Sequence, residues 1–337
     1  MVNKKKFKVV RLNSAVFPII KEEANALSSA EANIIAEDGD DINKENLDAD
    51  AVIVASAKIS GNLIRKMPNC RSITKLGIGT EKIDIDTATE KGIIVINIPD
   101  FCDSELADHT LALLLASVRK LFPLDKGVRD SEWKIRDLVV LKRIEGKKLG
   151  LIGFGNLARN FIARARILGV KIYAYDPYVG QKEMDGLGVI KVENLKDILR
   201  DSDYVVLMLP LTDETYHLIG EKELKMMKSE AILINVARGA IIDENMLYRA
   251  LKERWIDSAA IDVYEKINPF EEIPSRQYSP LFKLDNIILT PHIASCSVES
   301  LIEVKEKAAK ETARVLSGRW PENPVNRDVI PRFELRE

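Results

Sequence analysis

Short apolar runs alternate with amphipathic segments through the first hundred residues. The amphipathic segments, such as 19–27 and 83–91, space their apolar positions as a helix does. The apolar runs have the length of strands and lie at Phe7–Val10, Ala32–Ala36, Ala51–Ala55, Ile73–Leu76 and Ile93–Ile96. This alternation predicts a parallel sheet with helices on its faces.

A second series of the same kind begins near Lys147, after a long helix predicted over 104–121 with Ser104 as its cap. Its strand-like runs are Lys148–Ile152, Lys171–Tyr175, Asp203–Leu209, Ala231–Val236, Ser258–Val263 and Asn286–Thr290. Six parallel strands with connecting helices complete a doubly wound domain. A last helix is predicted from about 297 to Leu316, with Gly318 behind it as a stop signal.

A glycine-rich turn, GFGNLA at 153–158, follows the first strand of this second series and opens a helix. Gly153 permits a tight turn, Gly155 lets the backbone approach a pyrophosphate, and Ala158 lets helix and strand pack closely. Asp176 ends the next strand, where a carboxylate can accept hydrogen bonds from a ribose hydroxyl and would repel a 2′-phosphate. The pattern predicts a Rossmann unit that binds NAD rather than NADP.

Two further polar side chains follow strands of the same series. Arg238 comes after 231–236, and His292 comes after 286–290. The carboxyl ends of the strands are where doubly wound folds bind ligands. A guanidinium there can bind a carboxylate and polarise a carbonyl, and an imidazole can exchange a proton. The other two histidines, His109 and His217, are interpreted as structural.

With these motifs the chain resembles the D-isomer-specific 2-hydroxyacid dehydrogenase family over nearly its full length. The stretches that carry the resemblance are GIGT at 77–80, GFGNLA with YDP at 175–177, LPLT at 209–212, NVARG at 235–239, DVY at 262–264 and PHIAS at 291–295. The resemblance implies two α/β domains with doubly wound parallel sheets. Residues 1–103 and 297–337 would form a discontinuous, flavodoxin-like substrate domain, and 104–296 would form the Rossmann domain.

The resemblance also implies roles for individual residues. Arg238 would bind the substrate carboxylate and 2-oxo group, and His292 would exchange the proton on O2 while hydride passes between C2 and the nicotinamide. Asp262 would hold the nicotinamide side, and Pro210 would line it. The residues expected around the cofactor are Gly153, Gly155, Asn156, Leu157, Asp176, Pro177, Leu209, Pro210, Thr215, Val236, Ala237, Arg238, Asp262 and His292.

The substrate domain is expected to add Ser56, Lys75, Ile78 and Gly79 to the site, beside Arg238 and His292. The backbone amides of Ile78 and Gly79 would meet the substrate carboxylate, and Lys75 is a candidate for a second anionic group. The loops around Ser56, 98–101 and Trp133 would decide which 2-hydroxy acid fits, and the sequence does not choose among them.

One position departs from the family pattern. Members usually carry a glutamate five residues after the aspartate of the D-V-(F/Y) motif, where it pairs with the histidine and favours its protonated form. Ile267 stands there. Glu265 is a tentative catalytic substitute, Asn268 takes the place if one residue is inserted, Glu271 or Glu272 could fold in, and His292 could have no acidic partner.

Three functions remain open on the sequence. The first is an NAD-dependent oxidoreductase that interconverts a D-2-hydroxy acid and a 2-oxo acid. The second is a catalytically weak NAD-binding regulator, like the corepressor branch of the family. The third is hydride transfer with a substrate that lacks a 2-hydroxy group, as in formate-oxidising relatives.

Composition excludes several classes of partner and ligand. The formal net charge is −2, without the clustered basic excess of a nucleic-acid-binding protein. The most apolar stretch, 111–118, is too short to span a membrane. Three distant cysteines without a CxxC pattern predict no metal site and no disulfide framework, which favours a cytoplasmic location. The resemblance adds a homodimer joined through the cofactor domains, with the long helix and Trp133 at the interface.

Overall fold

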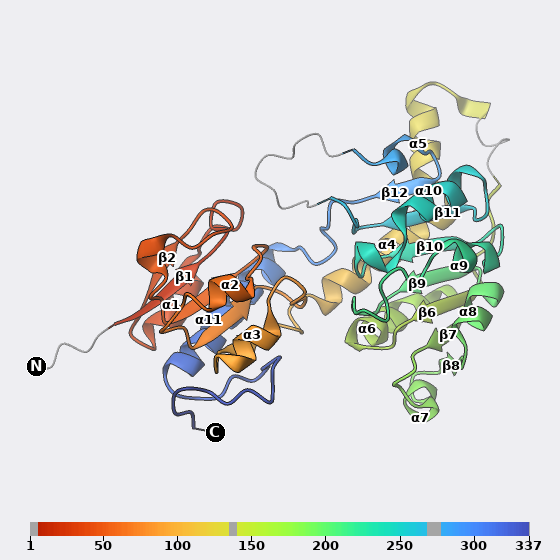
Figure 1. The fold of residues 1–337 in the computed structure, drawn as a ribbon. Coiled ribbons are helices and arrows are strands. Elements are labelled where there is room, and N and C mark those ends of the chain that lie inside the picture. Colours follow the sequence, from red (N-terminus) through yellow and green to blue (C-terminus); the bar gives the residue numbers. More distant parts are fainter. Residues whose placement is uncertain (1–5, 135–139, 268–277, 337) are drawn as a thin grey trace, which may run out of the picture. The chain divides into compact units, whose positions relative to one another are not determined.

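The computed structural model describes residues 6–134, 140–267 and 278–336 (Figure 1). The chain divides into two compact units. Met1–Phe101 and Ser297–Glu337 form the first unit, and Cys102–Cys296 form the second unit. Each unit is built on one parallel sheet, so the prediction of two parallel-sheet α/β domains is confirmed.

The first unit holds a five-stranded sheet in the order β2-β1-β3-β4-β5, the flavodoxin-like order. Its strands are β1 (Phe7–Arg11), β2 (Ala32–Ala36), β3 (Ala51–Val54), β4 (Ser72–Lys75) and β5 (Ile94–Ile96). Its helices are α1 (Lys21–Ser28), α2 (Gly61–Ile64), α3 (Ile85–Glu90) and α11 (Val298–Leu316), with a 3-10 turn η1 (Lys44–Asn46). All strand pairs are parallel, so every connection must cross over a face of the sheet.

The last helix packs on the sheet of the first unit although it is far away in sequence. Thr74 on β4 shares a hydroxyl–hydroxyl hydrogen bond of 2.7 Å with Thr312 on α11. The C-terminal helix is therefore an integral part of this unit.

A buried ion pair joins β1 to α1 in the same unit. Arg11 at the end of β1 donates through Nε to Glu23 Oε1 of α1 at 2.9 Å, and both side chains are fully buried.

The second unit holds a seven-stranded sheet in the order β12-β11-β10-β9-β6-β7-β8. Its strands are β6 (Lys148–Ile152), β7 (Lys171–Tyr175), β8 (Ile190–Lys191), β9 (Tyr204–Leu207), β10 (Ile232–Asn235), β11 (Ser258–Ile261) and β12 (Ile287–Leu289). Its helices are α4 (Asp103–Val118), α5 (Leu121–Arg129), α6 (Asn156–Ala165), α7 (Gln181–Asp185), α8 (Leu195–Asp201), α9 (Glu221–Met226) and α10 (Glu244–Lys252). Its 3-10 turns among the described residues include η3 (Arg166–Leu168), η4 (Gly239–Ile241) and η5 (Pro280–Lys283). The strand order reverses between β6 and β9, which is the point where such folds bind dinucleotides.

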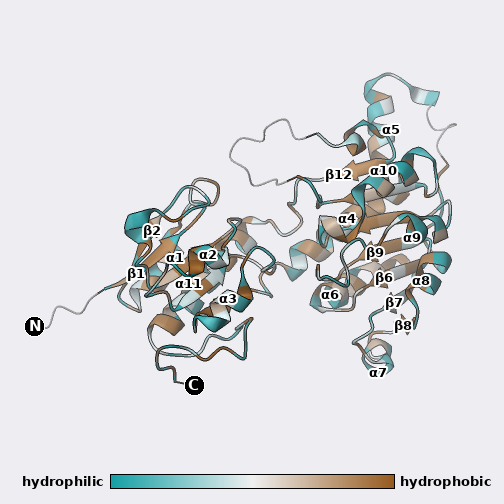
Figure 2. Ribbon diagram, viewed as in Figure 1, coloured by the Kyte–Doolittle hydropathy of each residue, from teal (hydrophilic) through white to brown (hydrophobic). Residues whose placement is uncertain are grey.

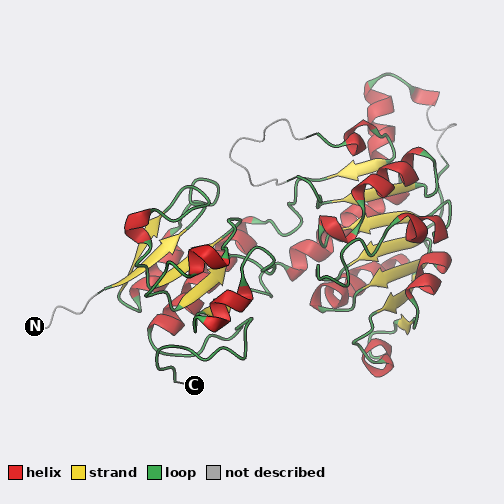
Figure 3. Ribbon diagram, viewed as in Figure 1, coloured by secondary structure: helices red, strands yellow, loops and turns green. Residues whose placement is uncertain are grey.

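Alternate residues of the central strands supply two cores. Val206 packs with Leu114 of α4 and Phe161 of α6, whereas Val205 packs with Leu199 of α8 and others on the opposite face. Figure 2 shows the strands as apolar ribbons, and Figure 3 shows helices in front of and behind them. The near-continuous apolar runs in the sequence follow from this double burial.

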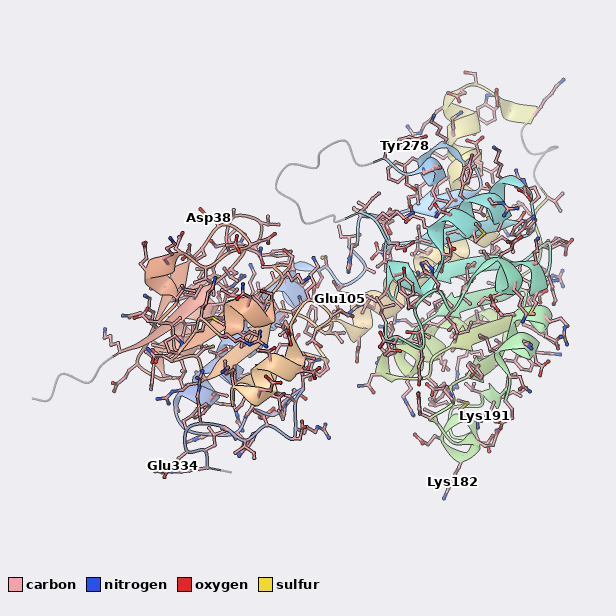
Figure 4. The ribbon with its side chains drawn as sticks, viewed as in Figure 1. Asp38, Glu105, Lys182, Lys191, Tyr278 and Glu334 are labelled. Carbon is pink, nitrogen blue, oxygen red and sulfur yellow. The ribbon has the colours of Figure 1, made fainter. Side chains whose placement is uncertain are left out.

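The structure differs from the sequence predictions at three places. The short edge strand β8 was missed; it carries Lys191 and lies beside the small helix α7 with Lys182 (Figure 4). The helix predicted over 104–121 is two helices, because Lys120 takes a left-handed conformation with φ of 52°. Ser104 is not the cap, since α4 begins after Cys102, and the Ser104 hydroxyl instead accepts a hydrogen bond from Arg164.

Within the described residues, no helix combines the length and apolar character needed to cross a bilayer.

Candidate active site

The glycine-rich turn joins β6 to α6. Gly153 has φ of 98°, and a Cβ on it would lie 2.3 Å from the carbonyl oxygen of Met208, so only glycine fits. Gly155 faces open space, because its Cβ would meet no atom within 4 Å. Gly155 stands at the N-cap of α6 and has no side chain to bind the first N–H groups of the helix, which leaves them available to a ligand. An uncapped helix N-terminus beside an open backbone is a fitting cradle for a pyrophosphate.

Asp176 follows β7 and is fixed against the same turn. Its Oδ2 accepts the N–H of Phe154 at 2.9 Å, and its Oδ1 accepts the N–H of Tyr178 at 2.9 Å. Each carboxylate oxygen keeps a further lone pair, which suits the hydroxyls of a ribose. The residues present therefore fit a dinucleotide with an unphosphorylated adenosine ribose.

The loop after β9 is closed by Thr215. Its hydroxyl accepts the N–H of Thr212 at 2.7 Å and donates to the carbonyl oxygen of Pro210 at 2.8 Å. This bond pattern fixes the turn that begins at Leu209 and Pro210, across the switch point from Gly153.

Asp262, directly after β11, holds the segment that carries His292. Its carboxylate is 1% exposed and accepts hydrogen bonds from Thr290 Oγ1 at 2.6 Å, Ile293 N at 3.0 Å and Ala294 N at 2.9 Å. The His292 N–H donates to the Asp262 carbonyl oxygen at 2.8 Å. His292 itself has φ of 55°, a left-handed conformation that is uncommon for a residue with a side chain. The backbone at His292 is thus held in a costly conformation by one residue, Asp262, through its backbone carbonyl oxygen and its buried carboxylate.

His109 on α4 extends this network. Its Nε2 lies 3.2 Å from Thr290 Oγ1 and 3.7 Å from Asp262 Oδ1. Because Thr290 has one hydroxyl proton and gives it to Asp262, the His109 Nε2 must be the donor to Thr290. His109 therefore has a specific structural role: it orients the Thr290 hydroxyl, which donates to the Asp262 carboxylate.

Arg238 lies at the turn between β10 and η4. Asn235 braces the turn from both sides, accepting the N–H of Ala237 at 3.0 Å and donating Nδ2 to the carbonyl oxygen of Arg238 at 2.9 Å. Gly239 follows, and a Cβ on it would lie 2.0 Å from the carbonyl carbon of Tyr264. The strands β10, β11 and β12 are neighbours, so Arg238, Asp262 and His292 follow three adjacent strand ends.

Glu265, the tentative catalytic residue, bonds to a different histidine. Its Oε1 lies 2.9 Å from Nε2 of His217, the histidine interpreted only as structural. Ile267 is half-buried. The remaining candidates Asn268, Glu271 and Glu272 lie outside the described residues.

In the first unit the substrate candidates lie at the ends of strands or on the loops that follow them. Asn13 has φ of 62°, and its Oδ1 accepts the N–H groups of Ser56 at 2.9 Å and Ala57 at 3.0 Å. Lys75 Nζ donates to the carbonyl oxygens of Ala55 and Leu76. Ile78 and Gly79 follow β4 and are at least partly exposed. Sequence reasoning missed Asn13, whose signal was an Asn just after a strand, a residue type that tolerates the left-handed region.

Burial keeps two weakly acidic side chains of the second unit, Tyr264 and Cys102, protonated. The pKa of Tyr264 is raised to about 12 by burial, so its hydroxyl remains the donor of a 2.9 Å bond to the Thr290 carbonyl oxygen. Burial likewise raises the pKa of the Cys102 thiol to about 12. Among the residues that the structure describes, no cluster of His, Cys, Asp and Glu could hold a metal ion.

Comparison with known proteins adds three findings. The profile described as D-isomer specific 2-hydroxyacid dehydrogenase, NAD binding domain, matches residues 111–294. The chain is 38% identical over 285 residues to the glyoxylate reductase of Thermococcus litoralis, covering 83% of this chain and 84% of that protein. It is 38% identical over 291 residues to D-3-phosphoglycerate dehydrogenase of Methanocaldococcus jannaschii, covering 86% of this chain and 54% of that protein, so it spans about half the length of that relative.

A similar solved structure is that of the D-lactate dehydrogenase from Aquifex aeolicus, complexed with NAD and lactic acid. The two share 26% identity with a TM-score of 0.80, and the match covers 90% of this chain and 93% of that chain.

Proposed function

Because the chain belongs to the D-isomer-specific 2-hydroxyacid dehydrogenase family, we propose that it is an NAD-dependent oxidoreductase interconverting a D-2-hydroxy acid and a 2-oxo acid. One observation carries the proposal beyond family membership. Arg238 and His292 follow strands on either side of β11, and the Asp262 carboxylate at the end of β11 braces the His292 loop. A cation and an imidazole on one sheet edge are the pair that reduction of a 2-oxo acid requires.

The roles of the chain's residues follow from their chemistry. When bound, NAD supplies hydride transfer at its nicotinamide. The Gly153 turn and Asp176 would hold its pyrophosphate and adenosine ribose. Arg238 would bind the substrate carboxylate and stabilise the negative charge that develops on O2. The His292 imidazole would give O2 its proton in reduction and take it in oxidation.

We propose a small 2-oxo acid such as glyoxylate or hydroxypyruvate as the substrate. Glyoxylate reductases are among the relatives matched over most of both chains. Lys75, the candidate for binding a second anionic group, donates to the backbone carbonyl oxygens of Ala55 and Leu76, which favours a role in linking the ends of β3 and β4.

The testing experiment is an NADH-oxidation assay across a panel of 2-oxo acids with the wild-type protein, Arg238→Ala and His292→Gln. We expect turnover of at least one small 2-oxo acid, and a loss of about 10²- to 10⁴-fold in kcat/KM for each variant. NADH binding, followed by fluorescence titration, should stay within a few-fold of wild type. Arg238→Ala with undiminished turnover, or a panel in which nothing is reduced although NADH binds, would overturn the proposal.

A homodimer is proposed on the exposed apolar side chains of α5 and the segment after it. Leu121, Phe122 and Val128 are each about half exposed, and Trp133 is 72% exposed. Exposed apolar side chains gathered on one element mark an association surface. The free thiols Cys70, Cys102 and Cys296 support a reducing, cytoplasmic location.

A further inference from the structure

We propose that His217 and Glu265 form a clamp that positions the Arg238 turn, which makes both of them positioning residues for substrate binding. The clamp is defined as the His217–Glu265 side-chain pair together with the backbone bonds of 217–219. The inference rests on the proposed role of Arg238 and assigns Glu265 a task other than pairing with His292.

One jaw of the clamp is the segment that begins at His217. The His217 N–H donates to the carbonyl oxygen of Ala240 at 2.8 Å, and the Ile219 N–H donates to that of Ile241 at 3.0 Å. Ala240 and Ile241 belong to η4, the 3-10 turn that follows Arg238 directly. The backbone of 217–219 is therefore bonded along one side of the Arg238 turn.

The other jaw is the segment 264–265. A Cβ at Gly239 would lie 2.0 Å from the Tyr264 carbonyl carbon and 2.4 Å from the Glu265 nitrogen, so this backbone touches the turn directly. Glu265 is anchored from behind, because its N–H donates to Glu244 Oε2 at 3.2 Å. The carboxylate of the buried Glu244 also accepts from Ser279 Oγ at 2.7 Å. The Arg238 turn thus lies between two backbone segments that have no covalent connection near it.

The side chains of His217 and Glu265 join the two jaws. His217 Nε2 and Glu265 Oε1 are 2.9 Å apart. The Tyr216 ring stacks on the His217 ring with centroids 4.0 Å apart and planes 18° apart, which restrains the imidazole. His217 has φ of 50°, a left-handed conformation that directs its backbone N–H and its ring towards different partners. The Tyr216 hydroxyl also lies 3.5 Å from Glu265 Oε1, so removing the Glu265 side chain breaks both links between the two segments, whereas removing the His217 side chain breaks the shorter link and the ring stacking that orders Tyr216.

The clamp and the alternative role of Glu265 predict different behaviour. In a clamp, either single change breaks the same bond, so the double variant is no worse than the singles. Displacing a substrate-binding cation raises KM for the 2-oxo acid more than it changes NADH binding. If Glu265 were instead the acidic partner of His292, Glu265→Ala would shift the pH profile of kcat, and its effect would add to that of His217→Ala.

The test uses His217→Ala, Glu265→Ala, their double variant and His217→Gln, which keeps a side-chain donor. Lys222→Gln on α9 is the matched control, because Lys222 is exposed and near His217 in sequence. Expected results are a KM increase of roughly 5- to 20-fold in each single variant, non-additivity in the double, partial recovery in His217→Gln, and Kd for NADH within about twofold. Hydrogen exchange of the amides at 238–242 should accelerate in His217→Ala whether or not a substrate has been found.

Failure of the clamp and failure of the proposed function are distinguishable. If Arg238→Ala abolishes turnover but the His217 and Glu265 variants keep wild-type KM and exchange rates, only the clamp is wrong. Additive effects of His217→Ala and Glu265→Ala, or a lowered Tm with unchanged KM and exchange, would also overturn it. If Arg238→Ala itself has no effect on turnover, the proposed function fails, and the exchange rates alone decide whether the turn is clamped.

Discussion

Replacing Asp262 by asparagine tests the account of the His292 loop most directly. The Asp262 carboxylate accepts from three donors, on Thr290, Ile293 and Ala294, and is almost fully buried. An amide has one acceptor oxygen, and its nitrogen is a donor. With the oxygen at the Oδ1 position, the bonds to Thr290 and Ile293 survive, but the amide nitrogen faces the Ala294 N–H. In the flipped orientation the amide nitrogen would face two donors, the Thr290 hydroxyl and the Ile293 N–H.

The size of the loss follows from that geometry. At least one bond to a charged acceptor disappears, worth about 1.5–3 kcal/mol, and a buried donor is left unsatisfied at about 1–3 kcal/mol. Since these costs overlap, we expect Asp262→Asn to lower the free energy of unfolding by about 2–5 kcal/mol. For a unit of the length of Cys102–Cys296, that lowers Tm by roughly 5–15 °C.

The same substitution should also lower activity. The left-handed conformation of His292 costs about 1–2 kcal/mol, and the carboxylate bonds to Ile293 and Ala294 help to hold it; the backbone bond from His292 to the carbonyl oxygen of residue 262 remains in the variant. A loosened loop can relax, so we expect kcat to drop about 100-fold while the fraction folded at 25 °C stays near one. Calorimetry and NADH-oxidation kinetics on the same preparation measure both effects. Asp285→Asn is the matched control, because Asp285 is exposed in the same unit. Asp262→Asn with a Tm within 2 °C of wild type and an intact kcat would refute the reasoning.

Two further predictions follow from the described contacts. Asp176→Ala should raise the ratio of NADPH to NADH affinity at least tenfold, because it removes the charge that opposes a 2′-phosphate. Direct binding titrations measure this ratio, and an unchanged ratio would show that Asp176 does not select the cofactor. Burial raises the pKa of Cys70 from 9.0 to about 12, so folding requires the neutral thiol, and stability should be complete below pH 9 and fall as the pH rises towards 12. Melting curves from pH 7 to 11 measure that slope, which Cys70→Ala should make shallower; an equal slope in the variant would show that other groups control it.

The central strands β3, β9, β10 and β11 could be predicted because each is buried on both faces. A strand such as β9 must be apolar at every position, since Val205 and Val206 enter different cores, and that requirement is visible in the sequence. The edge strand β8 escaped prediction because two residues cannot show a period. The helix break at Lys120 escaped for a different reason: its left-handed conformation stands at a lysine, without the glycine that usually marks one.

The limit of sequence reasoning at the site is clearest at Glu265. Parallel strands bring their carboxyl ends to one edge, so Arg238 and His292 could be assigned to that edge from their positions after apolar runs, whereas the role of Asp262 came from the family resemblance. The pairing of Glu265 with His217 could not be predicted, because Glu265 was considered only as a partner for His292, whereas His217 lies 48 residues away from it on another loop. The same holds for His109 and Thr290, which are 181 residues apart. Periodicity reports which face of an element is buried, but not which loop lies opposite a given side chain. The residues that position the Arg238 and His292 loops can therefore be identified only in the folded chain. The proposed clamp gives Glu265 the task of positioning the Arg238 turn, and not that of the glutamate that Ile267 replaces.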